Sequence, residues 1–253
     1  MTRLRALIFD VDGTLAETEP YGHRVAFNCA FAEAEWDWEW PVDLYGELLE
    51  VAGGKERIHF YWQQYRPDFP TPDNVEELIA KVHKAKTQHY QKLLAKGAIP
   101  LRPGVKRLLT EAHTQGMRLA IATTSALPNV HALLQNNLGA DSLSWFEVIA
   151  AGDIVPAKKP APDIYNYVLR EMELESQDCL AIEDSYQGLN AALQAGIKTV
   201  ITVNDYTKAQ DFSGALLVLN HLGEPDLPFS ILTGDVAEAS YLDMALIQVI
   251  GNW

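Results

Sequence analysis

Hydrophobic residues in this chain gather in short runs that end in polar clusters, a pattern typical of buried strands. The first run, residues 4–9, is rich in large apolar side chains, as expected of a strand buried on both faces of a parallel sheet. After residue 103 such runs alternate with segments of helical periodicity, which predicts an α/β fold, a parallel sheet with helices on both faces. We expect strands at residues 4–9, 118–122, 146–150, 179–182, 199–202 and 215–219, helices at residues 104–115, 128–137, 162–172, 186–195 and 241–250, and turns at residues 223–234.

The stretch between the first two predicted strands has a different pattern, helical with little strand. One helix is expected at residues 22–35, and another near residues 75–93 has apolar residues at steps of three and four and a capping box, Asp73 with Glu76. Residues 36–41 alternate tryptophan with acidic residues, and we expect a loop or first helical turn whose aromatic rings anchor the subdomain. We therefore predict a core of residues 1–16 and 98–253, and an inserted α-helical cap domain of residues 17–97.

Composition narrows the class of protein. With 253 residues and 48% hydrophobic content, the chain is long enough to bury a large core. Its formal net charge of −14 argues against nucleic acid and anionic membranes as partners. The two cysteines have no CxxC spacing, and no apolar run approaches the roughly 18 residues of a membrane span. We expect a monomer of the cytoplasm, or of the plastid stroma if the source is a plant or alga.

Two carboxylates follow the first predicted strand. Asp10 and Asp12 lie at its carboxyl end, and Gly13 permits the chain to turn after them. Ligands of open α/β sheets bind at this edge. Two charged carboxylates so close repel each other, which indicates a bound cation or a shared proton, and Mg²⁺ commonly bridges a carboxylate to a substrate phosphate. The alternative is that the segment is only a polar turn.

Three further polar clusters lie near predicted strand ends. The hydroxyl residues 123–125 would either contact phosphate oxygens or cap a helix. The two lysines at 158–159 precede a proline-stiffened helix entry, where a lysine would either neutralise a nucleophile and a phosphate or lie in solvent. The adjacent acids at 183–184 need either a cation or exposure to solvent.

These four clusters resemble, in order, the signature motifs of the haloacid dehalogenase superfamily. The first has the form Asp-x-Asp-Gly-Thr, and the fourth has the form Glu-Asp-Ser-x-x-Gly. The resemblance implies a Rossmann-like core and an aspartyl phosphotransferase with Asp10 as nucleophile and Asp12 as acid/base. It also implies catalytic roles for Thr123 and Lys159, and a Mg²⁺ cofactor. The implied metal ligands are Asp10, Asp12 and Asp184, with Glu183 as outer support.

The cap domain carries a candidate site for a second anionic group. Between residues 78 and 110 the chain has eight lysines and arginines and no acidic residue. His83, Lys86 and Tyr90 share one helical face, and residues 53–57 offer a flexible backbone with two more positive side chains. These residues either clamp a phosphate group that is not cleaved, or form a solvated helix face and an ordinary turn.

Glu17, residues 53–57 and the pair His83 and Lys86 resemble the CbbY subfamily. These are phosphatases of photosynthetic and carbon-fixing organisms that hydrolyse xylulose 1,5-bisphosphate, an inhibitor of Rubisco. One departure is the segment at residues 18–20, which differs from the usual, more helical continuation. The resemblance implies a sugar bisphosphate as partner, cleaved to xylulose 5-phosphate and phosphate. The expected substrate-binding residues are Asp10, Glu17, Gly53, Gly54, Lys55, Glu56, Arg57, His83, Lys86, Thr123, Thr124, Ser125 and Asn129.

Two other functions stay open. A β-phosphoglucomutase shares all four core motifs, but it must keep the phosphoaspartate from water long enough to return the phosphate to a bound sugar. A non-enzymatic regulator would bind a partner protein through the tryptophan-rich cap domain. Such a binder has no need of the intact set of Asp10, Asp12, Lys159 and Asp184.

Overall fold

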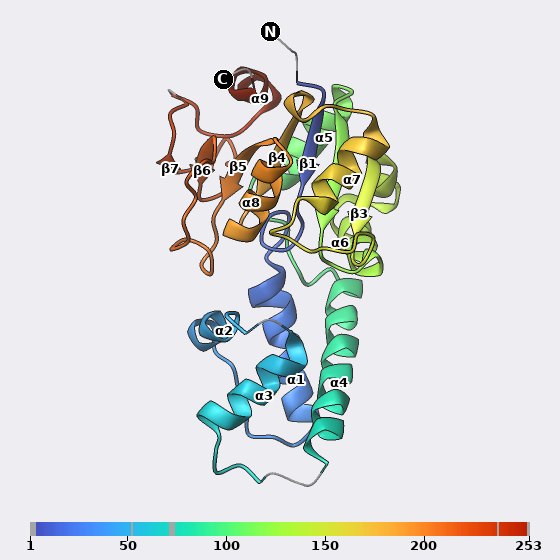
Figure 1. The fold of residues 1–253 in the computed structure, drawn as a ribbon, viewed down its shortest axis with the longest axis vertical. Coiled ribbons are helices and arrows are strands. Elements are labelled where there is room, and N and C mark those ends of the chain that lie inside the picture. Colours follow the sequence, from blue (N-terminus) through green and yellow to red (C-terminus); the bar gives the residue numbers. More distant parts are fainter. Residues whose placement is uncertain (1–3, 52, 71–73, 237, 252–253) are drawn as a thin grey trace. The chain divides into compact units, whose positions relative to one another are not determined.

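The chain forms two compact units, Met1–Glu17 with Pro100–Trp253, and Thr18–Ile99 (Figure 1). The computed structural model describes residues 4–51, 53–70, 74–236 and 238–251. Glu17 was expected in the inserted unit but belongs to the first one, because its N–H donates to the Pro100 carbonyl and its carboxylate pairs with Arg102. Within the described ranges, no helix has the length and apolar character to cross a bilayer.

The first unit is built on a seven-stranded sheet of order β3-β2-β1-β4-β5-β6-β7. All neighbouring strands are parallel except β6 and β7, which confirms the predicted α/β fold. The antiparallel strand β7 lies in a segment expected to contain only turns. Its three residues are all exposed and show no alternation of apolar and polar side chains that would indicate a strand. The strands are β1 (Ala6–Phe9), β2 (Arg118–Thr123), β3 (Phe146–Ala151), β4 (Cys179–Glu183), β5 (Lys198–Thr202), β6 (Leu217–Leu219) and β7 (Ile231–Thr233).

Helices connect the strands and cover the sheet. They are α5 (Val105–Thr114), α6 (Leu127–Leu138), α7 (Asp163–Met172), α8 (Tyr186–Gln194) and α9 (Met244–Gly251), with 3₁₀ segments at Ala140–Trp145 and Ser176–Asp178. Ala6 and Ile8 of β1 pack in one buried cluster with apolar residues of α7 and α8. Because side chains alternate along a strand, Leu7 and Phe9 face the opposite side of the sheet, and both are fully buried. The sheet is thus covered on both faces.

Strand β1 defines the edge at which ligands are expected. The chain adds β2 and β3 on one side of β1 and then crosses to β4 on the other side. Such a reversal of strand order opens a crevice at the carboxyl ends of the two central strands. The register pairs Phe9 with Ile121 of β2 and with Ile182 of β4, so Asp10 is level with Ala122 and Glu183.

The second unit is helical. A π-helical turn (Glu19–His23) leads into α1 (Arg24–Glu33), followed by α2 (Val42–Leu48), α3 (Gly54–Tyr65) and α4 (Val75–Ala95). Two helices were expected, near α1 and α4, and both are present. The continuation after Glu17 is helical after all, as a π turn. Asp73 of the expected capping box lies outside the described residues.

Helices α2 and α3 lie in the stretch expected to be helical, but their bounds were not predicted. Residues 54–57, which were expected to be flexible, form the first turn of α3. Gly53 precedes that turn with a φ of 94°, a conformation that favours glycine. Glu56 in the first turn complements the positive end of the helix dipole. These local features allow a helix to begin here, although two adjacent glycines in a sequence are more typical of a turn.

Tryptophan rings form the interior of the second unit. Trp38, Trp40 and Trp62 are at most 4% exposed. The Trp36 ring centroid lies 4.4 Å from that of Trp38, and the Trp38 and Trp62 centroids are 5.4 Å apart. Such contacts stabilise the packing of the unit. The expectation that these aromatic residues anchor the subdomain is therefore confirmed.

Candidate active site

Asp10 lies at the carboxyl end of β1 with Lys159 directly beside it. The Lys159 Nζ donates to Asp10 Oδ1 at 2.7 Å, to the Ala122 carbonyl at 2.9 Å and to Glu183 Oε1. These acceptors are the three residues that the register places level with one another. The lysine side chain is 7% exposed, so all three of its ammonium hydrogens are directed by the protein rather than by solvent.

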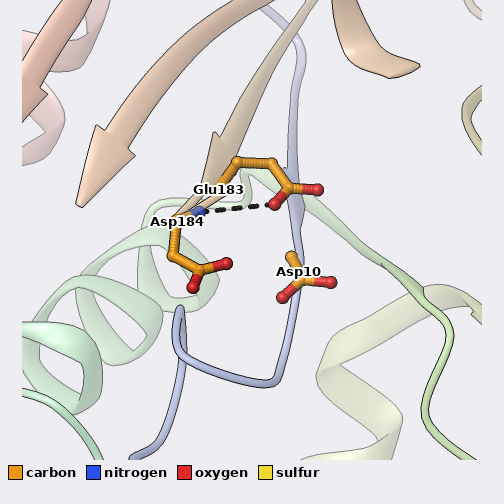
Figure 2. Close-up of side chains that lie close together, drawn as sticks. All are labelled: Asp10, Glu183 and Asp184. Atoms are coloured by element: carbon orange, nitrogen blue, oxygen red, sulfur yellow. Dashed lines mark hydrogen bonds between the residues drawn. The ribbon is translucent and has the colours of Figure 1, made fainter. Parts of the chain in front are cut away.

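Glu183 and Asp184 come from the end of β4, next to β1. The Glu183 carboxylate accepts a hydrogen bond from the Tyr165 hydroxyl at 2.6 Å and one from the Asp184 N–H at 3.3 Å. Asp184 Oδ2 accepts a hydrogen bond from Asn204 Nδ2 at 2.7 Å, and Thr14 Oγ1 lies 3.4 Å from Asp184 Oδ1. Figure 2 shows the side chains of Asp10, Glu183 and Asp184 converging from the two strand ends.

Burial and mutual repulsion disfavour the charged forms of Asp10 and Asp184. Burial raises the pKa of Asp10 to about 7, aided by the charges of Glu183 and Asp12 and opposed by Lys159. Burial also raises the pKa of Asp184 well above its usual range, and the charges of Asp10 and Glu183 add to this. For Lys159, burial alone would lower the pKa, but Asp10 and Glu183 outweigh it and raise the pKa. The site therefore holds excess negative charge.

The residues present fit a divalent cation. Oxygen atoms of Asp10, Glu183 and Asp184 lie within 4.8 Å of one another, and all three residues are buried. Three ionised carboxylates beside one ammonium leave two negative charges, which a divalent cation would balance. Carboxylate oxygens are the ligands that Mg²⁺ prefers. We assign Asp10 and Asp184 as the candidate ligands and Glu183 as outer support, because Glu183 Oε1 accepts two hydrogen bonds, from Lys159 and Tyr165. Among the described residues, the oxygens of Asp10 and Asp184 accept no more than one side-chain hydrogen bond each.

Asp12 was expected among the metal ligands, but its carboxylate is not part of this cluster. Among the described residues, its Oδ1 is buried and has no hydrogen-bond partner. The loop that carries it is tight, since the Gly13 N–H donates to the Ala16 carbonyl. Gly13 has a φ of 82°, and a Cβ there would lie 2.3 Å from Asp184 Oδ2. A glycine is therefore required for the loop to pass this close to Asp184.

The hydroxyl residues after β2 do not cap the following helix. Thr123 is buried, and its Oγ1 accepts a hydrogen bond from the Ser125 N–H at 3.1 Å. Helix α6 starts after Ala126, with no side-chain cap. Thr124 is exposed, and Ser125 and Asn129 are partly exposed, so their polar groups are available at this edge of the sheet.

The two lysines of the third motif have different environments. Lys158 Nζ lies 2.6 Å from Asp153 Oδ1 and is also bonded to the Gly152 carbonyl, in a partly exposed loop. Lys159 alone contacts Asp10. Of these two lysines, Lys159 is therefore the candidate for neutralising a nucleophile and a phosphate.

In the second unit, Lys55, His83 and Lys86 are electrostatic neighbours. Burial lowers the pKa of His83, and the charges of Lys86 and Lys55 lower it further, while Glu56 acts in the opposite direction. Lys86 Nζ lies 2.8 Å from His23 Nδ1. A Cβ at Gly54 would lie 2.5 Å from His83 Nε2, so the first turn of α3 packs directly against α4.

Arg57, another expected substrate contact, is bonded within the second unit. Its guanidinium donates to the Leu48 carbonyl at 2.8 Å, to the Val51 carbonyl at 3.1 Å and to the Tyr45 hydroxyl at 3.2 Å. These bonds connect α3 to α2 and to the residues that follow it. Arg57 therefore holds the first turn of α3 against α2.

Sequence reasoning missed four residues that contact the site. Thr14 and Asn204 bond to Asp184, Tyr165 bonds to Glu183, and Arg102 donates to the Gly13 carbonyl. Asn204 carried a usable signal, because it is a polar residue just beyond β5, the strand next to β4. Arg102 carried none, since in sequence it is one of eight basic residues in a single run.

Comparisons with known proteins identify the family of the chain. Residues 4–196 match the haloacid dehalogenase-like hydrolase family. A CbbY protein of Cupriavidus necator is 52% identical over 225 residues, which is 89% of this chain and 88% of the relative.

Solved structures extend the similarity. CbbY from Rhodobacter sphaeroides in complex with phosphate has 46% identity and a TM-score of 0.72, covering 86% of this chain and 94% of that chain. A mutant of that protein in complex with xylulose 1,5-bisphosphate has 44% identity and a TM-score of 0.73, with the same coverage. With a family match over most of its length and relatives of this identity, the chain belongs to the haloacid dehalogenase-like hydrolases and, among them, to the CbbY proteins.

Proposed function

We propose that this phosphatase is a Mg²⁺-dependent enzyme that hydrolyses xylulose 1,5-bisphosphate to xylulose 5-phosphate and phosphate. The observation that carries the chemistry is the contact of Lys159 Nζ with Asp10 Oδ1 at 2.7 Å, within a buried cluster of carboxylates. The substrate is supported by the CbbY relative solved with xylulose 1,5-bisphosphate. Removal of this Rubisco inhibitor would be the physiological role, in the cytoplasm or in a plastid stroma.

Asp10 acts as the nucleophile. One of its carboxylate oxygens attacks phosphorus, and the bond between phosphorus and the sugar oxygen breaks, which leaves an acyl phosphate on Asp10. The Lys159 ammonium stabilises the ionised form of Asp10 and the charge that develops on the phosphoryl oxygens. The Thr123 hydroxyl, whose oxygen accepts from the Ser125 N–H, is left to donate its own hydrogen to another phosphoryl oxygen.

Asp12 acts as the acid and then as the base. It donates a proton to the leaving sugar oxygen and then removes one from the water that hydrolyses the phosphoaspartate. Its buried Oδ1 has no hydrogen-bond partner among the described residues, which is consistent with this role because the atom is not committed to a structural hydrogen bond. A positioned acid/base contributes about 10²–10⁴-fold to the rate, so nucleophile positioning and fixed positive charge must supply most of the remainder.

A bound Mg²⁺ would neutralise the Asp10 and Asp184 carboxylates and withdraw charge from the phosphoryl oxygens. Asn204 and Thr14 hold Asp184 for this role, and Lys159 and Tyr165 hold Glu183 beside it. Each of these side chains keeps a carboxylate oriented before any ligand arrives.

The second phosphate of the substrate is assigned to Lys55, His83 and Lys86 of the cap domain. Two ammonium groups whose charges both act on one partly buried imidazole form a positive cluster suited to an anion. Binding energy gained there would be used to orient the phosphate that reacts at Asp10. The protein is proposed to act as a monomer.

A panel of sugar monophosphates and bisphosphates, each assayed with Mg²⁺ or with EDTA, tests the proposal. We expect the highest kcat/KM for xylulose 1,5-bisphosphate, release of phosphate together with xylulose 5-phosphate, and loss of turnover in EDTA. Conversion of β-glucose 1-phosphate to glucose 6-phosphate without net phosphate release would instead show a mutase. Equal activity on all members of the panel would contradict a bisphosphate substrate.

A further inference from the structure

Arg102 is a buried arginine outside the four motifs, 5% exposed, on the strand-like segment that returns the chain to the first unit. Leu101 forms an antiparallel bridge with Ala16, and the Arg102 N–H donates to the Leu15 carbonyl at 2.9 Å. The backbone of residues 15–17 is thus paired with that of residues 100–102. Arg102 therefore lies beside Glu17, the last residue of the first segment of this unit.

The terminal nitrogens of the guanidinium are bonded to four backbone carbonyls. NH1 donates to Gly13 and to Thr202, the latter at 2.7 Å, and NH2 donates to Val203 and to Asn220, the latter at 2.8 Å. Thr202 is the last residue of β5, and Asn220 follows β6. Because the carbonyls of Thr202, Val203 and Asn220 lie at the ends of β5 and β6, the guanidinium plane is fixed.

The third nitrogen, Nε, forms an ion pair with Glu17 Oε1 at 2.8 Å, without the angles of a hydrogen bond. The arginine side chain is 4% exposed and the Glu17 side chain is 25% exposed, so the carboxylate is held from the protein side and open on the other. Burial raises the pKa of Glu17, and the charge of Arg102 opposes that rise. A carboxylate accepts hydrogen bonds and repels phosphate, so the ligand groups it suits are hydroxyls.

The same guanidinium also holds the catalytic loop. Its bond to the Gly13 carbonyl fixes the residue that follows Asp12 and packs against Asp184. A displacement of Arg102 would therefore move both Glu17 and the Asp12–Gly13 backbone. A lysine has one nitrogen in place of three, so it cannot make both sets of contacts.

We propose that Arg102 is a positioning residue that orients the Glu17 carboxylate toward the hydroxyl groups of the sugar phosphate substrate and links it to the Asp12–Gly13 loop. The inference rests on the proposed function for the nature of the substrate. Glu17 was expected to contact substrate, and Arg102 is the residue that fixes its orientation. The role predicts a selective loss of catalysis on substrates with sugar hydroxyls.

A double-mutant cycle with Arg102→Lys, Glu17→Gln and the combined variant tests this role. The readout is the kcat/KM for xylulose 1,5-bisphosphate divided by that for para-nitrophenyl phosphate, which has no sugar. We expect each single variant to lower this ratio about tenfold, and the double variant to lower it no further, because both changes remove one interaction. Arg170→Lys is the control, since the Arg170 side chain is 68% exposed and pairs with its neighbour Glu171; it should leave the ratio unchanged.

The proposal would be overturned if the two single variants lowered the ratio additively in the double variant. It would also be overturned if Arg102→Lys kept the wild-type ratio but had a lower melting temperature, which would assign Arg102 a structural role only. If Arg102→Lys does not fold, the ratio measured for Glu17→Gln tests the proposal. An unchanged ratio in Glu17→Gln also overturns it. Failure of the wild-type enzyme to cleave xylulose 1,5-bisphosphate would instead contradict the proposed function. The cycle is then measured on the preferred sugar phosphate of the panel.

Discussion

At the scale of single residues, the site depends on hydrogen bonds that orient charged groups. Lys159 contacts Asp10 and Glu183, and Tyr165 contacts the same oxygen of Glu183. The Tyr165 hydroxyl thus helps to fix the Glu183 oxygen that accepts a hydrogen bond from Lys159. Asp10, Tyr165 and Glu183 are buried and the Lys159 side chain is 7% exposed, so solvent cannot replace a lost partner at low cost.

Tyr165→Phe should lower the free energy of unfolding by about 2 kcal/mol, because it removes a hydrogen bond to a buried charged group. Urea denaturation measures the effect. Tyr167→Phe is the matched control, on the same helix and only partly buried, and should change stability little. Equal stability of the two variants would show that the Tyr165 hydroxyl does not support Glu183.

At the scale of helices and strands, most of the fold was predictable from periodicity and the rest was not. Strands β1 to β6 have apolar runs bounded by polar residues, and α4 repeats apolar residues at helical spacing. Strand β7 is three exposed residues that pair only through their backbone, so no pattern marks it. Helix α3 begins between glycines that are typical of turns, and packing against His83 overrides that local preference.

Site residues follow the same division. Asp10, Thr123, Glu183 and Asp184 were predictable because each ends a strand or directly follows one. The contacts of Tyr165, Asn204 and Arg102 join residues far apart in sequence, and only the folded sheet brings them together. The placement of Asp12 outside the carboxylate cluster depends on the turn at Gly13, which spacing alone does not specify.

Gly54→Ala tests the packing of α3 on α4. In an open helical position this change stabilises by about 0.5–1 kcal/mol. Here the new methyl group would lie 2.5 Å from His83 Nε2, so we expect a loss of stability instead. Thermal unfolding of Gly54→Ala, His83→Ala and the double variant measures it. Less destabilisation by Gly54→Ala in the His83→Ala background confirms the contact, and an unchanged effect rules it out.

Lys86→Ala tests the anion site on α4. Loss of a charge partner for the uncleaved phosphate should lower kcat/KM for xylulose 1,5-bisphosphate by an amount equal to roughly 2–4 kcal/mol of transition-state free energy. The kcat/KM for para-nitrophenyl phosphate should fall far less. Lys84→Ala is the control, because Lys84 is exposed on the same helix. Steady-state kinetics on both substrates give the comparison. Equal losses on both would assign Lys86 to the fold or the chemistry.

At the scale of the whole molecule, the buried carboxyl groups link stability to pH and to metal. The pKa of Asp10 is about 7 in the folded chain against a usual value of 3.8, so the native state binds more protons than the unfolded state between these values. The contribution of Asp10 protonation to the free energy of unfolding is therefore fully present below about pH 4 and is lost as the pH rises through 7. Asp184 acts in the same direction.

In EDTA, the melting temperature of the wild-type protein should fall more steeply between pH 5 and 8 than that of Asp10→Asn, which lacks one of these titrating groups. Mg²⁺ binds ionised carboxylates, so it should raise the wild-type melting temperature more at pH 8 than at pH 5. Differential scanning calorimetry of both proteins across this range measures the slopes. Parallel slopes with and without Asp10 would contradict the raised pKa.

The most direct measurement for the central claim, that Asp10 accepts the phosphoryl group, is acid quenching followed by peptide mass spectrometry. Wild-type enzyme, Asp12→Asn and Asp10→Asn are each mixed with Mg²⁺ and para-nitrophenyl phosphate, whose leaving group departs without a proton. The account predicts a phosphorylated peptide at Asp10 that accumulates in Asp12→Asn, because water activation is lost, and no such peptide in Asp10→Asn. Phosphate release by the wild-type enzyme without any phosphorylation of Asp10 in the wild type or in Asp12→Asn, or with the phosphate on another residue, would contradict it.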